Sequence, residues 1–174
     1  MNKEDEIKEN LREVQEKSEK VCDNTSVGMI IRKDGKLLLI ERKKPPYGFA
    51  PPAGHVDDHG SYEQAAKDEV EEEVGLNVKN LRLIAEGKRE NYCRRKGGTW
   101  HYWKLYEAEV EGELKRSEDE TKQAGWYLPE QVEELTRRTE KYLADEISEE
   151  EWRGNPGLET TWLQWSKEVK LYEK

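Results

Sequence analysis

The sequence has few cysteines and no long hydrophobic run, and each absence excludes a class of protein. Its 174 residues contain only Cys22 and Cys93, which are too few for a disulfide framework and lack the spacing of a zinc or redox motif. No apolar segment reaches membrane length, and the opening residues MNKEDEIKEN contain no apolar signal region. We therefore expect plain thiols in a soluble, cytoplasmic protein that does not bind membranes.

The chain also lacks an excess of basic residues. Thirty Lys and Arg residues against 39 Asp and Glu residues give a formal net charge of −9, which argues against general nucleic-acid binding. An anionic substrate would then depend on metal ions and on a few local basic groups. The length suits one domain with a proper core, and neither an internal repeat nor a low-complexity linker indicates a second.

A cluster of carboxylates on one predicted helix is the main functional signal. Ser61 with Gln64 predicts a capping box at the start of this helix, and Gly75 predicts its end. Three glutamates inside the helix are spaced three or four residues apart and share one narrow arc. They are Glu69, Glu72 and Glu73. Such carboxylates repel one another unless a hard cation binds them, although an ordinary solvated acidic face is the alternative for the cluster taken alone.

Residues 54–76 resemble the signature of the Nudix hydrolases, G-x5-E-x7-R-E-U-x-E-E-x-G-U, in which U is a bulky aliphatic residue. The matching residues are Gly54, Glu69, Val70, Glu72, Glu73, Gly75 and Leu76. Gly60 replaces the first glutamate and Asp68 replaces the arginine. In the family those two side chains form an ion pair that braces the loop against the helix, so the resemblance implies that this chain lacks the brace.

The resemblance covers about residues 26–135 and implies an α+β fold, an α/β/α sandwich with a mixed β-sheet. It assigns catalysis to Glu69, Glu72 and Glu73, and leaves the general base open between Glu69 and Glu72. The implied cofactor is Mg²⁺ or Mn²⁺. Its implied ligands are Gly54, through its backbone carbonyl, and Glu69, Glu72 and Glu73. Glu120, six residues before Trp126, is either one more ligand or part of an acidic solvated loop.

Helical extensions are expected on both sides of the catalytic domain. We predict an amphipathic helix in residues 1–24, from Asp5 to about Val21, a catalytic domain over 25–138, and a helical extension over 139–174. Aromatic residues in that extension recur at helical spacing and predict core packing or a homodimer contact. They are Trp162, Trp165 and Tyr172, with Val169 on the same face.

Within the domain, Asp34-Gly35 between two apolar runs predicts a hairpin of strands 26–32 and 36–42. Further strands are expected at 81–85, 100–110 and 126–128, followed by a helix over 129–135 that opens with Pro129.

Five residues outside the signature are candidates for substrate binding. Arginines near the predicted site can bind phosphate, and aromatic residues before the signature can stack on a base or ribose. The candidates are Arg42, Tyr47, Phe49, Arg94 and Arg95. The alternative for Arg42 is surface solubility. For Tyr47 and Phe49 it is packing beneath the loop, and for Arg94 and Arg95 it is an exposed basic turn. His55, His59 and His101 form no metal-ligand pattern with the cysteines, and we expect His55 to stabilise the loop.

The leading interpretation is a metal-dependent hydrolase that cleaves a diphosphate linkage in a nucleoside diphosphate joined to another moiety. Its partner would be a small nucleotide or diphosphate substrate. The substitutions at Gly60 and Asp68 keep open a nucleotide-binding or sensor module with little turnover. A structural partner protein that acts through its terminal helices is a third possibility.

Overall fold

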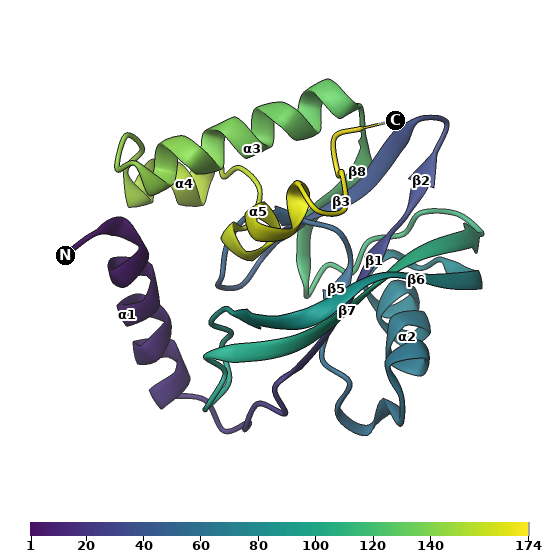
Figure 1. Cartoon of the computed structure of the whole chain (residues 1–174), viewed down its shortest axis with the longest axis horizontal. Coiled ribbons are helices and arrows are strands. Elements are labelled where there is room, and N and C mark those ends of the chain that lie inside the picture. Colours follow the sequence, from purple (N-terminus) through teal and green to yellow (C-terminus); the bar gives the residue numbers. More distant parts are fainter. Residues whose placement is uncertain (174) are drawn as a thin grey trace.

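The computed structural model describes residues 1–173 (Figure 1). The helices are α1 (Lys3–Glu16), α2 (Tyr62–Val74), α3 (Pro129–Leu143), α4 (Glu149–Gly154) and α5 (Thr160–Ser166). The strands are β1 (Thr25–Ile30), β2 (Arg32–Lys33), β3 (Lys36–Arg42), β4 (Phe49–Ala50), β5 (Ala53–Gly54), β6 (Asn77–Glu90), β7 (Trp100–Glu111) and β8 (Thr121–Tyr127). A 3-10 turn, η1 (Asp57–His59), precedes α2.

The strands form two four-stranded sheets that lie between helices. One sheet has the order β5-β1-β7-β6, in which β1 is parallel to β7 and antiparallel to β5. In the other, β3 pairs antiparallel with β2, β4 and β8. Helices α3, α4 and α5 lie on one side of the strands and α2 lies on the other (Figure 1). The predicted α+β sandwich with a mixed sheet is confirmed.

The predicted hairpin is present only in part, although its turn has the expected backbone: the first predicted strand is divided, so that β2 pairs with β3 and β1 pairs with β5 and β7 in the other sheet. Asp34 and Gly35 both have positive φ, 52° and 77°, and Lys33 pairs with Lys36 across them. Other boundaries differ from the prediction. Strand β6 runs for 14 residues instead of five, because its solvent-facing polar residues hide it from a search for apolar runs. Strand β8 is likewise longer, and α3 continues to Leu143.

Helix α1 ends earlier than predicted. It stops at Glu16, and Val21, which was expected to extend its apolar face, is 72% exposed. Val21 instead forms an isolated parallel bridge with Lys96, in the loop between β6 and β7. Hydrogen bonds between Ser18 and Lys20 turn the chain between these two segments.

Two apolar clusters fill the core on opposite sides of the strands. On one side α2 buries Ala66, Val70 and Val74. On the other side Trp162 and Trp165 from the C-terminal segment pack edge-on against Trp103 of β7. These two tryptophans are therefore core residues and are not exposed for contact with a second chain. Helix α5 ends at Ser166, so Val169 and Tyr172 follow it in a turn instead of extending its face.

The C-terminal segment reaches the first strand directly. A Cβ added to Gly28 of β1 would lie 2.5 Å from the Trp162 ring and 2.7 Å from Leu105. Glycine is the residue that permits this approach.

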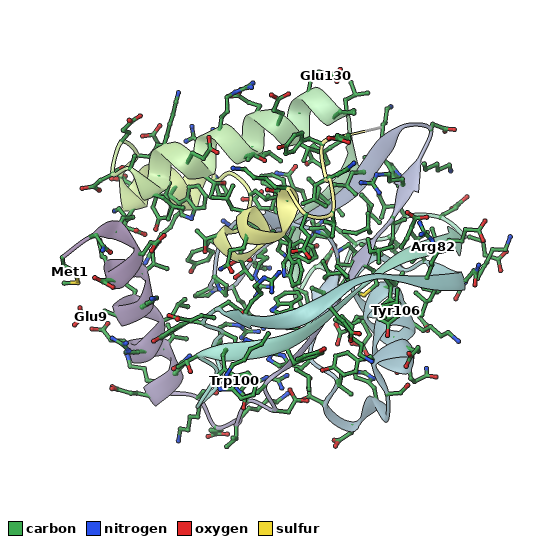
Figure 2. All side chains as sticks on the ribbon, viewed as in Figure 1. Met1, Glu9, Arg82, Trp100, Tyr106 and Glu130 are labelled. Atoms are coloured by element: carbon green, nitrogen blue, oxygen red, sulfur yellow. The ribbon has the colours of Figure 1, made fainter. Side chains whose placement is uncertain are left out.

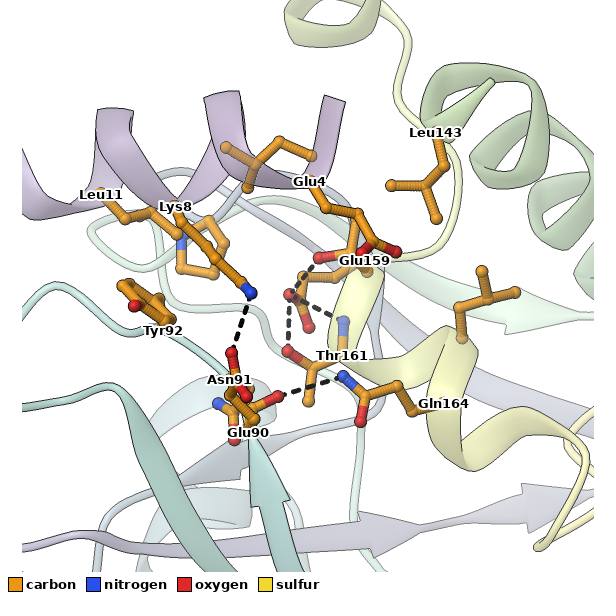
Figure 3. A pocket seen from close by; sticks show the side chains of 14 residues that line it. Glu4, Lys8, Leu11, Glu90, Asn91, Tyr92, Leu143, Glu159, Thr161 and Gln164 are labelled. Carbon is orange, nitrogen blue, oxygen red and sulfur yellow. Dashed lines mark hydrogen bonds and ion pairs between the residues drawn. The ribbon is translucent and has the colours of Figure 1, made fainter. Parts of the chain in front are cut away.

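Helix α1 packs against its own chain. Lys8 Nζ lies 2.8 Å from Glu90 Oε1, and Gln15 Nε2 donates to the carbonyls of Cys93 and Gly98 at 2.8 and 2.9 Å. A cavity of about 430 Å³ remains between α1 and α5, and Lys8 and Glu90 point toward each other at its edge (Figure 3). Across residues 1–173, none of the helices is long and apolar enough to cross a membrane.

We predict that Trp162→Ala lowers the free energy of unfolding by about 3 to 5 kcal/mol, because it empties a large volume in the core. Trp100 is the matched control. It is 38% exposed and lies at the end of β7, far from α3 (Figure 2), so Trp100→Ala should cost about 1 kcal/mol or less. Urea denaturation of both variants measures the difference. Equal losses would contradict a core role for Trp162.

Candidate active site

Most of the predicted site residues line one cleft of about 810 Å³, which we call the acidic cleft. Its lining includes Gly54, Glu69, Glu72, Glu73 and Glu120, together with Arg42, Arg94 and Arg95. Residues from five separate parts of the chain thus converge there. Tyr47 and Phe49 are not among the lining residues of the described chain. Phe49 is buried edge-on against Tyr127, as the packing alternative expected, and Tyr47 lies beneath Lys122 and Arg153.

Local sequence fixes both ends of the helix that carries the glutamates. Ser61 Oγ accepts a hydrogen bond from the Gln64 N–H at 3.0 Å, and Gly75 ends α2 with φ +69°. The predicted capping box is only half formed. The Gln64 side chain donates to Asp68 at 2.9 Å instead of returning to Ser61.

Glu69 and Glu73 place two carboxylates side by side beneath the cleft. They lie one helical turn apart and line the same cleft, and Glu73 is 7% exposed. Within residues 1–173, Glu73 Oε2 has no hydrogen-bond partner. Burial, with repulsion from Glu72, raises the pKa of Glu69 to about 7. Burial and the charge of Glu69 also raise the pKa of Glu73, and Arg42 opposes that rise.

Gly54 brings the backbone directly against Glu69. A Cβ at this position would collide with the Glu69 carboxylate and would lie 2.6 Å from its Oε1. A side chain at residue 54 would therefore displace the glutamate. The close approach leaves the loop backbone and the carboxylate next to each other.

These oxygen atoms suit a hard divalent cation. A buried carboxylate with an oxygen that has no partner among the described residues, and a half-buried carboxylate that repels it, are stabilised when a cation such as Mg²⁺ or Mn²⁺ binds between them. Glu69 and Glu73 can hold it, next to the backbone at Gly54. Glu120 is close enough to raise the pKa of both carboxylates further.

A brace between loop and helix exists, with the charges exchanged. His59 Nδ1, in η1, lies 2.7 Å from Asp68 Oδ2, in α2, and His59 Nε2 lies 3.5 Å from Glu69 Oε1. Burial lowers the pKa of His59, but Asp68, Glu69 and Glu72 outweigh it, so the pKa is raised and the imidazolium is favoured. The family's glutamate and arginine are absent, as the sequence indicated, but a different pair takes their place. The loop supplies the base one residue before Gly60, and the helix supplies the acid.

The three arginines differ in the freedom of their guanidinium groups. Arg95 is bound to Asp57 at 2.7 Å. Arg42 donates from Nε to the Pro46 carbonyl at 2.7 Å, and neither it nor Arg94 forms an ion pair with a carboxylate of residues 1–173. Burial and the charge of Arg42 lower the pKa of Arg94, as expected of neighbouring cations without an anion. Arg42 and Arg94 therefore remain available for an anionic ligand.

Sequence reasoning missed several residues at this cleft. Glu159 also lines it; its buried carboxylate accepts hydrogen bonds from the Thr161 N–H and hydroxyl, both at 3.1 Å. The sequence gives no signal for it, because it lies more than 80 residues beyond the signature. The expectation that the histidines form no metal-ligand pattern with the cysteines is also wrong for His55 and His101. Ligand atoms of Cys22, His55, Cys93 and His101 lie within 4.8 Å of one another.

We predict a coupling free energy of about 0.5 to 1 kcal/mol between His59 and Asp68, because the pair is partly exposed. A double-mutant cycle of His59→Ala and Asp68→Ala, followed by urea denaturation at pH 6, measures it. The exposed pair Glu134 and Arg137 is the control and should show a smaller coupling. Additive effects at His59 and Asp68 would show that the contact does not brace the loop.

Comparison with known proteins agrees with this geometry. The NUDIX domain family model matches residues 23–146. A MutT NUDIX hydrolase from Burkholderia pseudomallei is similar in structure, with a TM-score of 0.55 and 27% identity over 62% of this chain and 84% of that chain. A MutT protein from Bacillus halodurans has a TM-score of 0.52 and 25% identity, over 63% and 71% of the two chains.

A C. elegans Ap4A hydrolase shares the fold, with a TM-score of 0.52 and 22% identity over 69% of this chain and 92% of that chain. No curated protein matches the sequence. The family model covers well over half of the chain, and the carboxylates of its signature helix converge on one cleft. The chain therefore belongs to the Nudix family.

Proposed function

We propose that this chain is a Mg²⁺- or Mn²⁺-dependent hydrolase of a diphosphate linkage in a nucleoside diphosphate joined to another moiety. Substrates of this kind include nucleoside triphosphates, dinucleoside polyphosphates and nucleotide sugars. The observation that carries the proposal is that the buried Glu73, the half-buried Glu69 and two arginines line one cleft, and neither arginine pairs with a carboxylate among the described residues. The similar MutT NUDIX hydrolase from Burkholderia pseudomallei supports a hydrolytic reaction.

Glu69 and Glu73 would hold the cation, with the carbonyl of Gly54 as the ligand that the family resemblance implies. When bound, the cation would neutralise charge on the phosphate oxygens and on the leaving phosphate. Glu72 and Glu120 line the same cleft and are exposed, so they can contribute further oxygens at its rim.

Arg42 and Arg94 would bind the phosphates on the other side of the cleft. A guanidinium presents its donors in a fixed fork that fits phosphate oxygens, and burial strengthens such charge-assisted hydrogen bonds. Arg95 would act differently. Its ion pair with Asp57 holds the loop after Cys93 in position beside the cleft.

Glu72 is the better placed of the two candidates for the general base. A bound cation would lower the pKa of Glu69 and keep that carboxylate as a ligand. Glu72 is exposed on the same side of α2, so it can accept a proton from the attacking water while Glu69 and Glu73 stay in place.

The sensor alternative is weaker than the sequence indicated. Its motivation was the loss of the brace at Gly60 and Asp68, and His59 with Asp68 supplies a brace of opposite polarity. The interpretation as a partner protein that uses its terminal helices is also weakened, because α1 and α5 pack on the chain itself.

A panel of nucleoside triphosphates, dinucleoside polyphosphates and nucleotide sugars, assayed with Mg²⁺ or Mn²⁺ for released phosphate products, tests the proposal. Glu73→Gln should lower kcat/KM by about 100-fold or more, because it removes ligand charge and keeps the shape. It should also raise the melting temperature in EDTA, because a buried repulsion is lost. Glu71→Gln, exposed on the same helix, is the control and should change neither value much. No hydrolysis of any panel member would sink the proposal.

Arg94→Met should raise KM about 10-fold or more, because a buried charge-assisted hydrogen bond to phosphate is lost. Arg82→Met is the control, since Arg82 is an exposed arginine of β6 paired with Glu107 (Figure 2). Steady-state kinetics of both variants on the best panel substrate measures the effect. An unchanged KM in the Arg94 variant would remove this residue from the substrate site.

A further inference from the structure

Two cysteines and two histidines from four separate segments meet beside the acidic cleft. Cys22 precedes β1, His55 follows β5, Cys93 lies in the loop after β6, and His101 lies in β7. Cys22 Sγ lies 3.5 Å from His55 Nε2 and 3.3 Å from His101 Nε2, and all four ligand atoms lie within 4.8 Å of one another. We call this group the Cys2His2 cluster.

These separations are close to those around a tetrahedral zinc ion. Typical Zn–S and Zn–N bonds place sulfur and nitrogen ligands about 3.6 Å apart at the tetrahedral angle. The two sulfur–nitrogen distances of Cys22 are near that value. Small side-chain shifts would therefore bring the cluster onto a metal, without movement of the strands.

Both sulfur atoms accept backbone hydrogen bonds of the kind that stabilise a thiolate. The Asn24 N–H donates to Cys22 Sγ at 3.2 Å, and the Arg95 N–H donates to Cys93 Sγ at 3.4 Å. In each case the donor lies two residues after the cysteine. Such hydrogen bonds orient thiolate ligands and favour their charged form.

The backbone around the cluster leaves space for the sulfur atoms. The N–H of Cys22 donates to the Lys96 carbonyl at 2.8 Å, and that of Cys93 donates to the Gly98 carbonyl at 2.9 Å. A Cβ at Gly98 would collide with Cys93 Sγ. The absence of a side chain at Gly98 therefore leaves room for the sulfur of Cys93.

His101 shows that the cluster is incompletely satisfied by hydrogen bonds alone. Its side chain is 1% exposed, and Nδ1 has no hydrogen-bond partner in the described part of the chain. Its other ring nitrogen, Nε2, contacts Cys22 Sγ, and a thiol is a weak hydrogen-bond partner. A metal–nitrogen bond at Nε2 would replace that weak contact, and Nδ1 would still need an outer partner.

We propose that Cys22, His55, Cys93 and His101 bind one Zn²⁺ ion in a closed, structural site. Thiolate and imidazole ligands favour zinc over the hard cations that suit the glutamates of the acidic cleft. Four protein ligands leave no open position for a water or a substrate, which is typical of structural zinc. The ion connects Cys22, in the segment before β1, and Cys93, in the loop after β6, to His55, which follows Gly54. This inference is independent of the proposed hydrolysis.

The full chain, produced in zinc-supplemented medium without a polyhistidine tag, tests the proposal by elemental analysis. We expect one zinc per chain, and Cys93→Ser should lower the affinity for zinc by more than about tenfold, measured by competition with a chelator, since loss of even an outer partner of a metal ligand has such an effect. His59→Asn changes the one histidine outside the cluster and should keep the zinc. Glu73→Gln should also keep it, which separates this site from the glutamate site.

Cobalt substitution of the unaltered chain gives a readout that does not require a variant to fold. Tetrahedral Co²⁺ bound to thiolates should show intense visible bands and a sulfur-to-cobalt charge-transfer band in the near ultraviolet. Wild-type protein without these bands and without zinc would overturn the proposal, as would mass spectrometry showing a Cys22–Cys93 disulfide in the purified chain. If the Cys93→Ser variant still contains zinc and the Glu73→Gln variant does not, the ion binds at the glutamates. That result would also overturn the proposal.

Discussion

The repulsion between the buried carboxylate of Glu73 and the half-buried carboxylate of Glu69 is the constraint around which the site is arranged. Glu69 and Glu73 lie one helical turn apart on the inner side of α2, and Val70 and Val74 beside them are buried in the core. The helix cannot rotate to expose the glutamates without exposing those valines. The fold therefore keeps negative charge in a place where only a cation, or a proton, relieves it.

The surroundings of α2 hold that charge in position. Gly54 brings the preceding loop against Glu69, and the contact between His59 and Asp68 fixes the loop to the helix from the other side. The imidazolium also faces Glu69 and Glu72, so one residue both braces the loop and reduces the repulsion.

Local patterns predicted the helix of the signature, the hairpin at Asp34-Gly35 and the glutamate cluster, because each depends on residues close in sequence. The sequence also pointed to Glu120, Arg42 and Arg94, which the structure places in the cleft. Contacts between distant segments could not be predicted in the same way. His59 and Asp68 lie on different elements, and the Cys2His2 cluster joins residues 22, 55, 93 and 101, whose meeting depends on the parallel pairing of β1 with β7.

The contact between Gly28 and Trp162 has a consequence for synthesis of the protein. Gly28 of the first strand is made long before Trp162, whose ring covers it. Until Trp162 has been made, the apolar side of β1 that faces α5 has no native cover, and transiently exposed surface of this kind promotes aggregation. This half of the core can therefore close only after synthesis has proceeded through α5.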